Sequence, residues 1–413
     1  MASAMRPTLP ALLATEASMT HPFPADPIAA VTHPNPYPYY AQLRNGAPLI
    51  RDETLKLWVA ARADTVRAIL DDARLTVRPV GEPVPRTIAG GPAGEIYARL
   101  ARMTEGDTHR VARQALVKGL GGVDIVKVRE SSSREAAAVM ARYETCDAAL
   151  LDTLAFAIPV RIVAELAGLP PNDALAATVR QFVACLSPLS PPEALDNAHT
   201  AATALQAKLH ALTRAEASTS PLIERIVSGG LEASEELPNA LVSNLLGLFS
   251  QTFEATAGLI GNGIVTLATH PELIARLQAS PADIDAFVRE VARFDPAVHN
   301  TRRFARELIC MDGATLQPGD AVLVVLAAAS RDEASFHAPE RFMLDRPEHA
   351  LPGFGAGRHA CPGEAIARTI ASGVLAALVT GGFDFADPAL RWSYQPSSNG
   401  RIPRFNFIGS HAS

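Results

Sequence analysis

The sequence predicts a mainly α-helical protein with small β-sheets, and two observations carry that prediction. Apolar residues recur at helical spacing through most of residues 111–227. Residues 240–269 are then mostly apolar with a single charged residue, and as one helix they would span about 45 Å. Such a helix is long enough to cross a whole domain, so we expect it at the centre of the fold. We expect a flexible tail over residues 1–25 and a single domain over residues 26–413.

The elements before residue 111 are short. Three closely spaced prolines open a helix that contains residues 39–43, and two apolar runs within residues 49–60 flank a charged turn and predict a hairpin. Asp64 or Thr65 is a suitable cap for the helix that follows. Residues 79–103 are rich in proline and glycine and predict a long loop, a kind of segment that is often functional.

The second half returns to sheet only briefly. Prolines interrupt the helical pattern at residues 187–193, and His270-Pro271 ends the long apolar helix. Helices continue to Arg293, and strand-like segments with two glycine turns occupy residues 308–326. The sequence shows no internal repeat and no low-complexity linker.

Composition excludes several classes of protein. The chain has 37 Lys and Arg against 43 Asp and Glu and no basic block, which argues against nucleic-acid binding. Its four cysteines form no CxxC pair, so neither a zinc site nor a disulfide framework is indicated, and a reducing cytoplasm is expected. Glu254 lies inside the long apolar helix, where a bilayer would disfavour a carboxylate, so we expect no membrane span.

The most informative segment contains Cys361. Residues 354–363 read Phe-Gly-Ala-Gly-Arg-His-Ala-Cys-Pro-Gly and lead into a helical pattern. Pro362 suits the first helical position, so the free N–H groups of Gly363 and Glu364 are expected to point at the sulfur. These amides and the positive end of the helix would stabilise a thiolate.

The flanking residues of this loop suggest a flat ligand. Gly355 and Gly357 allow the backbone to approach a bulky planar group, and Phe354 can pack beside the sulfur. The ten-residue pattern resembles the axial-ligand loop of the cytochrome P-450 family, the haem-thiolate monooxygenases. By this resemblance Cys361 is the axial ligand of the iron of haem b, and its sulfur donates electron density that favours cleavage of the O–O bond.

The resemblance runs from about residue 26 to residue 407 and implies a triangular, helix-rich prism. The haem would lie between the long central helix and the helix after the cysteine loop. The chain is most similar to the soluble bacterial branch, which implies a monomer that oxidises a small organic molecule with O2. Its electrons would come from a ferredoxin or flavodoxin-type donor and its reductase.

Two further motifs agree with the family. Glu290 and Arg293 form a Glu-x-x-Arg pair on one helix face, and the resemblance makes Arg341, in Pro-Glu-Arg-Phe, the third member of a structural network. The two propionates of a haem require cationic or hydrogen-bonding partners. The family positions that supply them are occupied here by His109, Arg113, Arg303 and His359.

The sequence departs from the family in the middle of the long helix. The usual pattern there ends in an acid followed by threonine, and these residues help to deliver the protons that O2 activation consumes. Here the acid is Glu254, but Ala255 replaces the threonine, and Gln251 and Thr252 replace two small residues. Thr252 and Thr256 share a helix face, and neither simply substitutes for the missing hydroxyl. The Gln251 amide is expected to lean toward the helix N-terminus.

Three hypotheses follow from Ala255. A substrate hydroxyl could position the water that a threonine would otherwise hold. Alternatively, peroxide could drive turnover, or the enzyme could catalyse oxidative coupling or desaturation. A non-enzymatic alternative is a haem-based gas sensor, although no composition shift marks an output domain.

The resemblance also suggests a substrate pocket and a docking patch. The pocket would be mainly apolar with a few polar groups, which favours a hydrophobic natural product as substrate. A positive patch near the cysteine would receive an acidic ferredoxin. The pocket residues are Phe182, Leu246, Phe249, Ser250, Phe253, Ala255, Val298 and Asn300, and those of the patch are Arg102, Arg110, Lys118 and Arg358.

Overall fold

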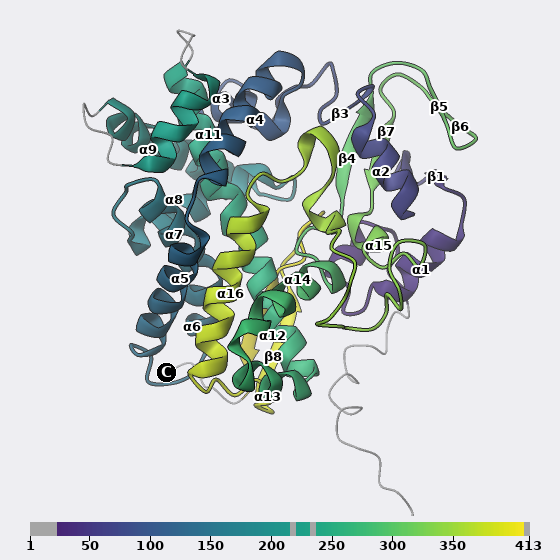
Figure 1. The fold of residues 1–413 in the computed structure, drawn as a ribbon. Coiled ribbons are helices and arrows are strands. Elements are labelled where there is room, and N and C mark those ends of the chain that lie inside the picture. The colour runs from purple at the N-terminus through teal and green to yellow at the C-terminus, as the bar shows by residue number, and fades with distance from the viewer. Residues whose placement is uncertain (1–22, 215–219, 232–236, 409–413) are drawn as a thin grey trace, which may run out of the picture.

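The computed structural model describes residues 23–214, 220–231 and 237–408. Most of the tail expected over residues 1–25 therefore lies outside the described residues. Helices fill one side of the molecule and a five-stranded sheet the other (Figure 1). The mainly helical fold with small sheets is confirmed.

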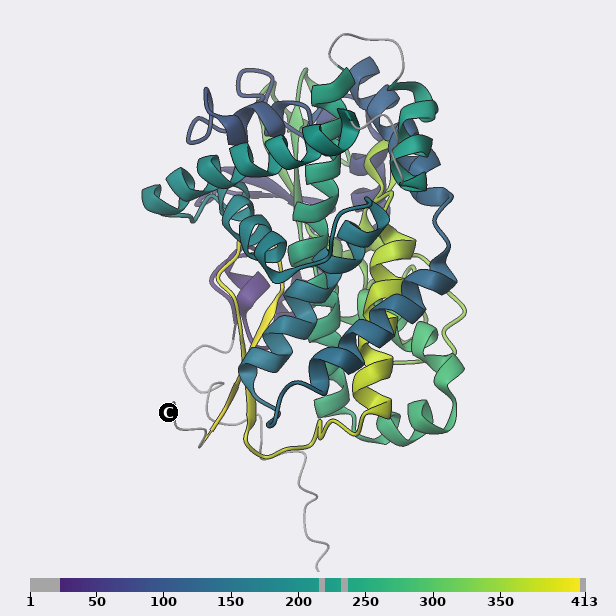
Figure 2. The same cartoon turned by 90° about the vertical axis from the view of Figure 1, so that its left-hand side faces the viewer.

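The long central helix runs from residue 237 to residue 269. It consists of α11 (Leu237–Gln251), a π-helical segment η7 (Thr252–Thr256) and α12 (Ala257–Thr269). The helix stands at the centre of the helical side, with α16 (Glu364–Thr380) beside it (Figures 1 and 2). Within the described part of the chain, no helix is both long and apolar enough to cross a membrane.

The other helices surround this pair. Among the longer helices, α5 packs extensively on α16, and α8 packs on α9. Two more π segments, η4 and η6, interrupt or extend helices. The bounds are α1 (Tyr37–Asn45), α2 (Ala63–Asp71), α3 (Pro92–Ala98), η3 (Ala101–Met103), α4 (Gly106–Gly121), α5 (Ile125–Met140), α6 (Ala148–Asp152), η4 (Thr153–Ala157), α7 (Ile158–Leu166), α8 (Asp173–Val183), η5 (Ala184–Leu186), α9 (Pro192–Arg214), α10 (Pro221–Ile226), η6 (Val227–Leu231), α13 (Glu272–Ala279), α14 (Ile284–Phe294) and α15 (Leu326–Ala329).

The main sheet has the strand order β1-β2-β7-β4-β3. The predicted hairpin is its edge, since β1 and β2 pair antiparallel, and β2 then pairs parallel with β7. Alternate residues of β7 enter different apolar clusters, with Val322 and Val324 on one face and Leu323 on the other. Two separate hairpins are formed by β5-β6 and β8-β9. The bounds are β1 (Leu49–Asp52), β2 (Leu57–Ala60), β3 (Leu75–Thr76), β4 (Thr301–Ala305), β5 (Ile309–Met311), β6 (Ala314–Leu316), β7 (Ala321–Val324), β8 (Leu390–Tyr394) and β9 (Pro403–Phe407).

Two local predictions are corrected. The segment 79–103 is not one loop, because it contains α3 and η3; Pro92 occupies the first turn of α3, where its missing N–H costs nothing. Helix α2 begins one residue before Asp64, and the carboxylate of Asp332 accepts a hydrogen bond from the N–H of Ala63 at 2.7 Å. The partner that secures this helix end is thus distant in sequence.

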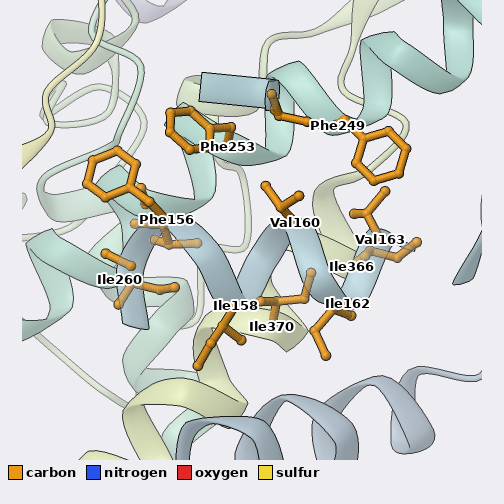
Figure 3. Packing of buried hydrophobic residues seen from close by; sticks show 14 of the residues in the cluster. Phe156, Ile158, Val160, Ile162, Val163, Phe249, Phe253, Ile260, Ile366 and Ile370 are labelled. Carbon is orange, nitrogen blue, oxygen red and sulfur yellow. The ribbon is translucent and has the colours of Figure 1, made fainter. Parts of the chain in front are cut away.

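The helical core closes around the lower half of the central helix. Phe156 of η4 contacts Phe253 of η7, and Ile260 of α12 lies near Phe156, while Ile366 of α16 lies beside Val163 in the same apolar cluster, to which Ile370 also belongs (Figure 3). All of these side chains are buried. The core therefore fixes the position of α16, and with it that of the cysteine loop, against the centre of the long helix.

Arg401 joins three distant parts of the chain. Its guanidinium donates to the carbonyl oxygens of Val31, His33 and Pro34 at 3.1, 2.8 and 3.1 Å. Its Nε donates to a carboxylate oxygen of Asp295 at 3.0 Å. The charge is completely enclosed, so these bonds replace the water that burial removes.

Candidate functional site

The cysteine loop is shaped by two glycines with left-handed backbone. Gly355 has φ +74 and Gly357 has φ +64, conformations that other residues rarely adopt. A Cβ at Gly357 would also lie 2.3 Å from the Asp71 carboxylate of α2. The carbonyl oxygen of Phe354 accepts the N–H of Cys361 at 2.9 Å and closes the loop. The loop is therefore bent back on itself with the cysteine at its inner end.

Cys361 lies before the N-terminus of α16. The helix begins at Glu364 with Gly363 as its N-cap, so Pro362 precedes the helix instead of occupying its first position. Burial raises the pKa of Cys361, while hydrogen bonds from the N–H groups of Gly363 and Glu364 and the charge of Arg113 act in the opposite direction. The amides point at the sulfur as predicted, and coordination to a metal would deprotonate it.

Two basic side chains near the loop have buried nitrogens without partners. Arg303 Nε and His359 Nδ1 are buried and make no hydrogen bond within the described residues. Burial and the nearby charge of Arg358 lower the pKa of Arg303 to about 10. The other ring nitrogen of His359 lies 3.3 Å from a carboxylate oxygen of Glu105. Both side chains are suited to binding an additional anion.

The helix α4 brings the other two predicted cations to the same place. His109 is buried, with its ring nitrogens 2.7 Å from the carbonyl oxygen of Ala101 and 3.0 Å from that of Arg358. Its ring contacts that of His359 in a tilted arrangement, with a centroid distance of 4.0 Å. Arg113 donates to the carbonyl oxygen of Ala360 at 2.5 Å. The structure thus brings these four side chains together around the cysteine loop.

The third member of the Glu290 network is Arg346, and the prediction of Arg341 is wrong. Arg293 and Arg346 both bind the buried Glu290 carboxylate, at 2.6 to 2.9 Å and 3.0 to 3.1 Å. The chain turns at Met343, whose N–H also donates to Glu290 at 3.0 Å. This turn directs Arg346 inward, whereas Arg341 is exposed and contributes only its carbonyl oxygen.

The acid predicted in the long helix lies in its π segment. Glu254 is partly accessible and hydrogen-bonds the side chain of Gln395, which directly follows strand β8. Burial raises the pKa of Glu254, opposed by Arg102 and by Gln395. Ala255 is also partly accessible and offers no hydroxyl. Thr256 is enclosed, and its hydroxyl oxygen makes no hydrogen bond with the described residues.

The residues just before Glu254 differ in exposure. Gln251 is exposed, and its amide donates to the carbonyl oxygen of Gly247 at 3.1 Å, toward the helix N-terminus as expected. Thr252 is partly accessible. Ser250 is buried and bonds the same carbonyl oxygen at 3.2 Å. One side of the helix, at residues 251–255, therefore presents several accessible side chains.

The predicted pocket residues do not line one common cavity. Phe182, Leu246 and Phe249 are at most 1% exposed and pack in the helical core, so they present no accessible surface in this structure. Phe253 faces Phe156 and lines a surface cavity of about 450 Å³ with residues of α5, α7 and α8, on a side of the helix where no residue of the cysteine loop contributes.

The segment after α14 lies beside the turn between β8 and β9. Val298 forms an isolated bridge with Gly400, and the Asn300 amide donates to the carbonyl oxygen of Ser398 at 2.9 Å. Gln395 at the base of this turn was not predicted. No pattern in the sequence around Gln395 identifies it, because its partner Glu254 is far away in the sequence.

The predicted docking patch is not a continuous surface. Arg110 and Lys118 are exposed on α4. Arg358, however, is half-buried, pairs with Glu105 at 3.1 Å and donates to two carbonyl oxygens. The charge of Arg102 acts on Glu254 in the long helix, and its Nε is buried. Arg102 and Arg358 are therefore removed from the patch.

Comparison with known proteins agrees with this geometry. A family model described as cytochrome P-450 matches residues 284–385, which contain the Glu290 network and the cysteine loop. The chain is 31% identical over 352 residues to the cytochrome P-450 monooxygenase PikC of Streptomyces venezuelae, covering 81% of this chain and 80% of that protein. It is 28% identical to 20-oxo-5-O-mycaminosyltylactone 23-monooxygenase of Streptomyces fradiae, over 83% and 81% of the two chains.

Solved structures share the fold. The cytochrome P-450 RauA, complexed with a biosynthetic intermediate of aurachin RE, has a TM-score of 0.76 at 23% identity and covers 96% of this chain and 98% of its own. CalO2 has a TM-score of 0.77 at 24% identity, with coverage of 90% and 96%. The site and the fold together define a haem-thiolate oxygenase. The chain belongs to the cytochrome P-450 family. It is a monooxygenase of that family, which is against the gas-sensor hypothesis, and its cofactor is haem b.

The residues present fit a haem. The cysteine sulfur would bind the iron, and the unpaired nitrogens of Arg303 and His359 would satisfy propionate oxygens, with Arg113 and His109 adding donors nearby. When bound, the haem supplies the activation of O2, and the thiolate favours cleavage of the O–O bond.

Proposed function

We propose that this chain inserts an oxygen atom from O2 into a mainly apolar, natural-product-like small molecule, and that protons reach the site through Glu254 without a neighbouring threonine. One observation carries the proposal. Glu254 lies partly accessible in the π segment of the long helix, with Gln395 near it, while Ala255 next to it is also partly accessible and has no hydroxyl. The names of two relatives refer to oxidation of 20-oxo-5-O-mycaminosyltylactone and mycinamicin VIII, which supports a natural product as substrate.

The carboxyl group of Glu254 suits proton transfer. Burial raises its pKa, so the neutral acid persists to higher pH than for an exposed glutamate and has a proton to give. Interaction with the Gln395 side chain opposes this rise. Ala255 leaves room for a water, which a hydroxyl group of the substrate would position. The hydroxyl of Thr256 is enclosed, so it does not replace that group.

The test compares coupling, defined as product formed per reductant consumed. Natural products, including macrolactones, are first screened for a shift of the haem Soret band on binding. With a hydroxylated substrate, we expect Glu254→Gln to lower the turnover rate about tenfold to a hundredfold. With the deoxy analogue, the unmodified enzyme should release peroxide instead of product, and Ala255→Thr should restore coupling. Unchanged coupling with the deoxy analogue would refute the assistance by substrate.

Peroxide-driven turnover is the second candidate, and the same alanine favours it, because peroxide already carries the protons that O2 activation consumes. The two candidates differ in their response to Glu254→Gln. That variant should impair turnover supported by O2 and reductant and leave turnover supported by hydrogen peroxide nearly unchanged. If only peroxide supports product formation in the unmodified enzyme, the second candidate holds.

We further propose that the chain acts as a monomer and that an acidic ferredoxin or flavodoxin delivers electrons. The docking surface is smaller than the sequence suggested and consists of Arg110 and Lys118 on α4. This helix also carries Arg113 and His109, which lie against the cysteine loop. An acidic partner bound there would be separated from the site by a single layer of the protein.

A further inference from the structure

The backbone around Arg102 is fixed to two elements of the site. Arg102 is the middle residue of η3, between α3 and α4. The N–H of Ala101 donates to the Asn244 side chain of α11 at 2.9 Å, and the carbonyl oxygen of Ala101 lies 2.7 Å from His109 of α4. The Arg102 side chain therefore starts from a rigid point between the long helix and the cysteine-loop region.

The guanidinium of Arg102 lacks an anionic partner. Its Nε is buried without a hydrogen bond, and the described residues provide no ion pair for it. Burial also lowers the pKa of Arg102. The residue as a whole is partly accessible, so its guanidinium can meet a molecule from outside the chain, while its enclosed Nε lacks the partner that buried polar atoms normally have. This side chain is thus poised to accept an anion from outside the chain.

The position of Arg102 differs from that of Arg303. The groups whose charges act on Arg102 are Tyr97, Glu254 and Cys185, which belong to α3, the long helix and η5. The charges that act on Arg303 are those of Arg358 and Glu105, beside the cysteine loop.

These two surroundings separate the two arginines. Arg303 lies among charges of the cysteine-loop region, whereas Arg102 lies in a segment whose backbone is bonded to α11 of the long helix, and the charge of Glu254 of that helix acts on it.

Glu254 does not neutralise Arg102. The two side chains interact through space, but no ion pair within 4.0 Å joins them, and the hydrogen bond of Glu254 is made with Gln395. Burial also raises the pKa of Glu254, so its anionic form is disfavoured. A carboxylate that forms two hydrogen bonds with the guanidinium would be the better partner.

We infer that Arg102 binds a carboxylate of the substrate, so that the substrate class is an otherwise apolar organic acid. The inference rests on the proposed function, because it places this acid on the distal side of the haem. The planar guanidinium favours a carboxylate over a hydroxyl or an amide, since only the anion matches both its charge and its paired donors. The apolar remainder of the substrate would extend from this anchor toward the accessible side of the long helix.

The test uses imidazolyl alkanoic acids of graded chain length and the matching imidazolyl alkanols. The imidazole of each compound binds the haem iron and shifts the Soret band, so affinities come from spectral titration of the holoenzyme. At the best chain length, we expect the acid to bind the unmodified enzyme at least about tenfold more tightly than the alcohol. Arg102→Ala should abolish this preference and change the affinity for the alcohol less than about twofold.

Controls separate this inference from the alternatives. Arg86→Ala, in the same segment but with a side chain 90% exposed, should keep the preference for the acid. Arg102→Lys keeps the charge but lacks the paired donors, so it should keep part of the preference for the acid. This variant provides a second measurement if Arg102→Ala is unstable.

An unchanged preference for the acid in Arg102→Ala would overturn the inference. If Arg102→Ala also loses haem to apomyoglobin faster, the carboxylate that Arg102 binds is a haem propionate. If neither the acids nor the alcohols shift the Soret band of the unmodified protein, the proposed function itself fails.

Discussion

At Glu290, one buried carboxylate joins two segments of the chain. Its oxygens bind Arg293 of the same helix, Arg346 fifty-six positions later and the N–H of Met343. Both guanidinium groups also donate to carbonyl oxygens of the segment between β7 and the cysteine loop. The Glu290 carboxylate and the two guanidinium groups balance one another's charge. Removal of one arginine therefore leaves the buried Glu290 anion undercompensated.

The contrast between two arginines tests this network. We expect Arg346→Ala to lower the free energy of unfolding by about 3–5 kcal/mol and to reduce haem content, because the Glu290 charge would lose a buried partner. Arg341→Ala removes an exposed side chain and should change stability by less than about 0.5 kcal/mol. Urea unfolding of the holoproteins measures both. Equal effects of the two substitutions would contradict the assignment of Arg346.

The cysteine loop shows, at the scale of an element, how much a local pattern can predict. The positive-φ glycines and the N–H groups aimed at the sulfur of Cys361 are set by residues close together in sequence, and they were predictable. Pairings of Glu290 with Arg346 and of Glu254 with Gln395 depend on how distant segments fold, so the sequence alone led to Arg341 and missed Gln395.

The same reasoning explains the misplaced cations and the missed helix. Arg102 and Arg358 lie near the haem-binding elements in sequence, but only the tertiary fold shows that they point inward. The helix α3 is short and lies among prolines and glycines, where local propensity predicts a loop. Burial of Ile96 and Tyr97 outweighs that propensity.

Two glycines of the cysteine loop provide a matched pair of substitutions. Gly357→Ala places a Cβ 2.3 Å from the Asp71 carboxylate at a residue with positive φ. We expect it to lower the free energy of unfolding by about 1–3 kcal/mol and to weaken haem retention. Gly363→Ala, whose Cβ would lie 4.0 Å from the cysteine sulfur at a negative φ, should cost less than about 1 kcal/mol. Chemical denaturation of both variants checks this order, and a larger loss for Gly363→Ala would disprove it.

Helix α4 carries the prediction about the electron donor. Arg110 is 65% exposed, and Asp107 is its one ion-pair partner among the residues that the structure describes, so its reversal is expected to leave the fold intact. Arg110→Glu should slow electron transfer from an acidic ferredoxin and reduce its dependence on salt. Arg86→Glu, far more exposed and outside α4, is the control. Stopped-flow reduction at several salt concentrations gives the answer, and identical rates for Arg110→Glu and the unmodified enzyme would place the docking surface elsewhere.

Across the whole molecule, Glu105 links the sheet, α4 and the cysteine loop. Its carboxylate accepts the N–H of Val77 at 2.9 Å and binds Arg358 and His359 at 3.1 and 3.3 Å. Burial alone would raise the pKa of Glu105, but hydrogen bonds from His359, Val77 and Arg358 outweigh it and lower the pKa from 4.5 to about 2. The anion is therefore stabilised more in the folded state than in the unfolded state.

This pKa difference predicts how acid acts on the protein. The folded state binds fewer protons than the unfolded state in this range, so the contribution of Glu105 is complete above about pH 4.5 and is lost as the pH falls toward about 2. The thermal midpoint of the unmodified protein should therefore fall more steeply between about pH 5 and pH 3 than that of Glu105→Gln. Calorimetry at several pH values compares the two. Parallel curves would show that this carboxylate does not carry the acid sensitivity.

The Arg401 cluster has a consequence for synthesis of the chain. Residues 31–34 leave the ribosome well before the guanidinium that satisfies their carbonyl oxygens, which lies up to 370 positions later. Until Arg401 emerges, the carbonyl oxygens of residues 31–34 and the carboxylate of Asp295 lack their common partner, so the two segments cannot dock as they do in the folded protein. A ribosome that stalls or a protease that cuts before residue 401 would therefore leave an open chain whose apolar surfaces are available to chaperones.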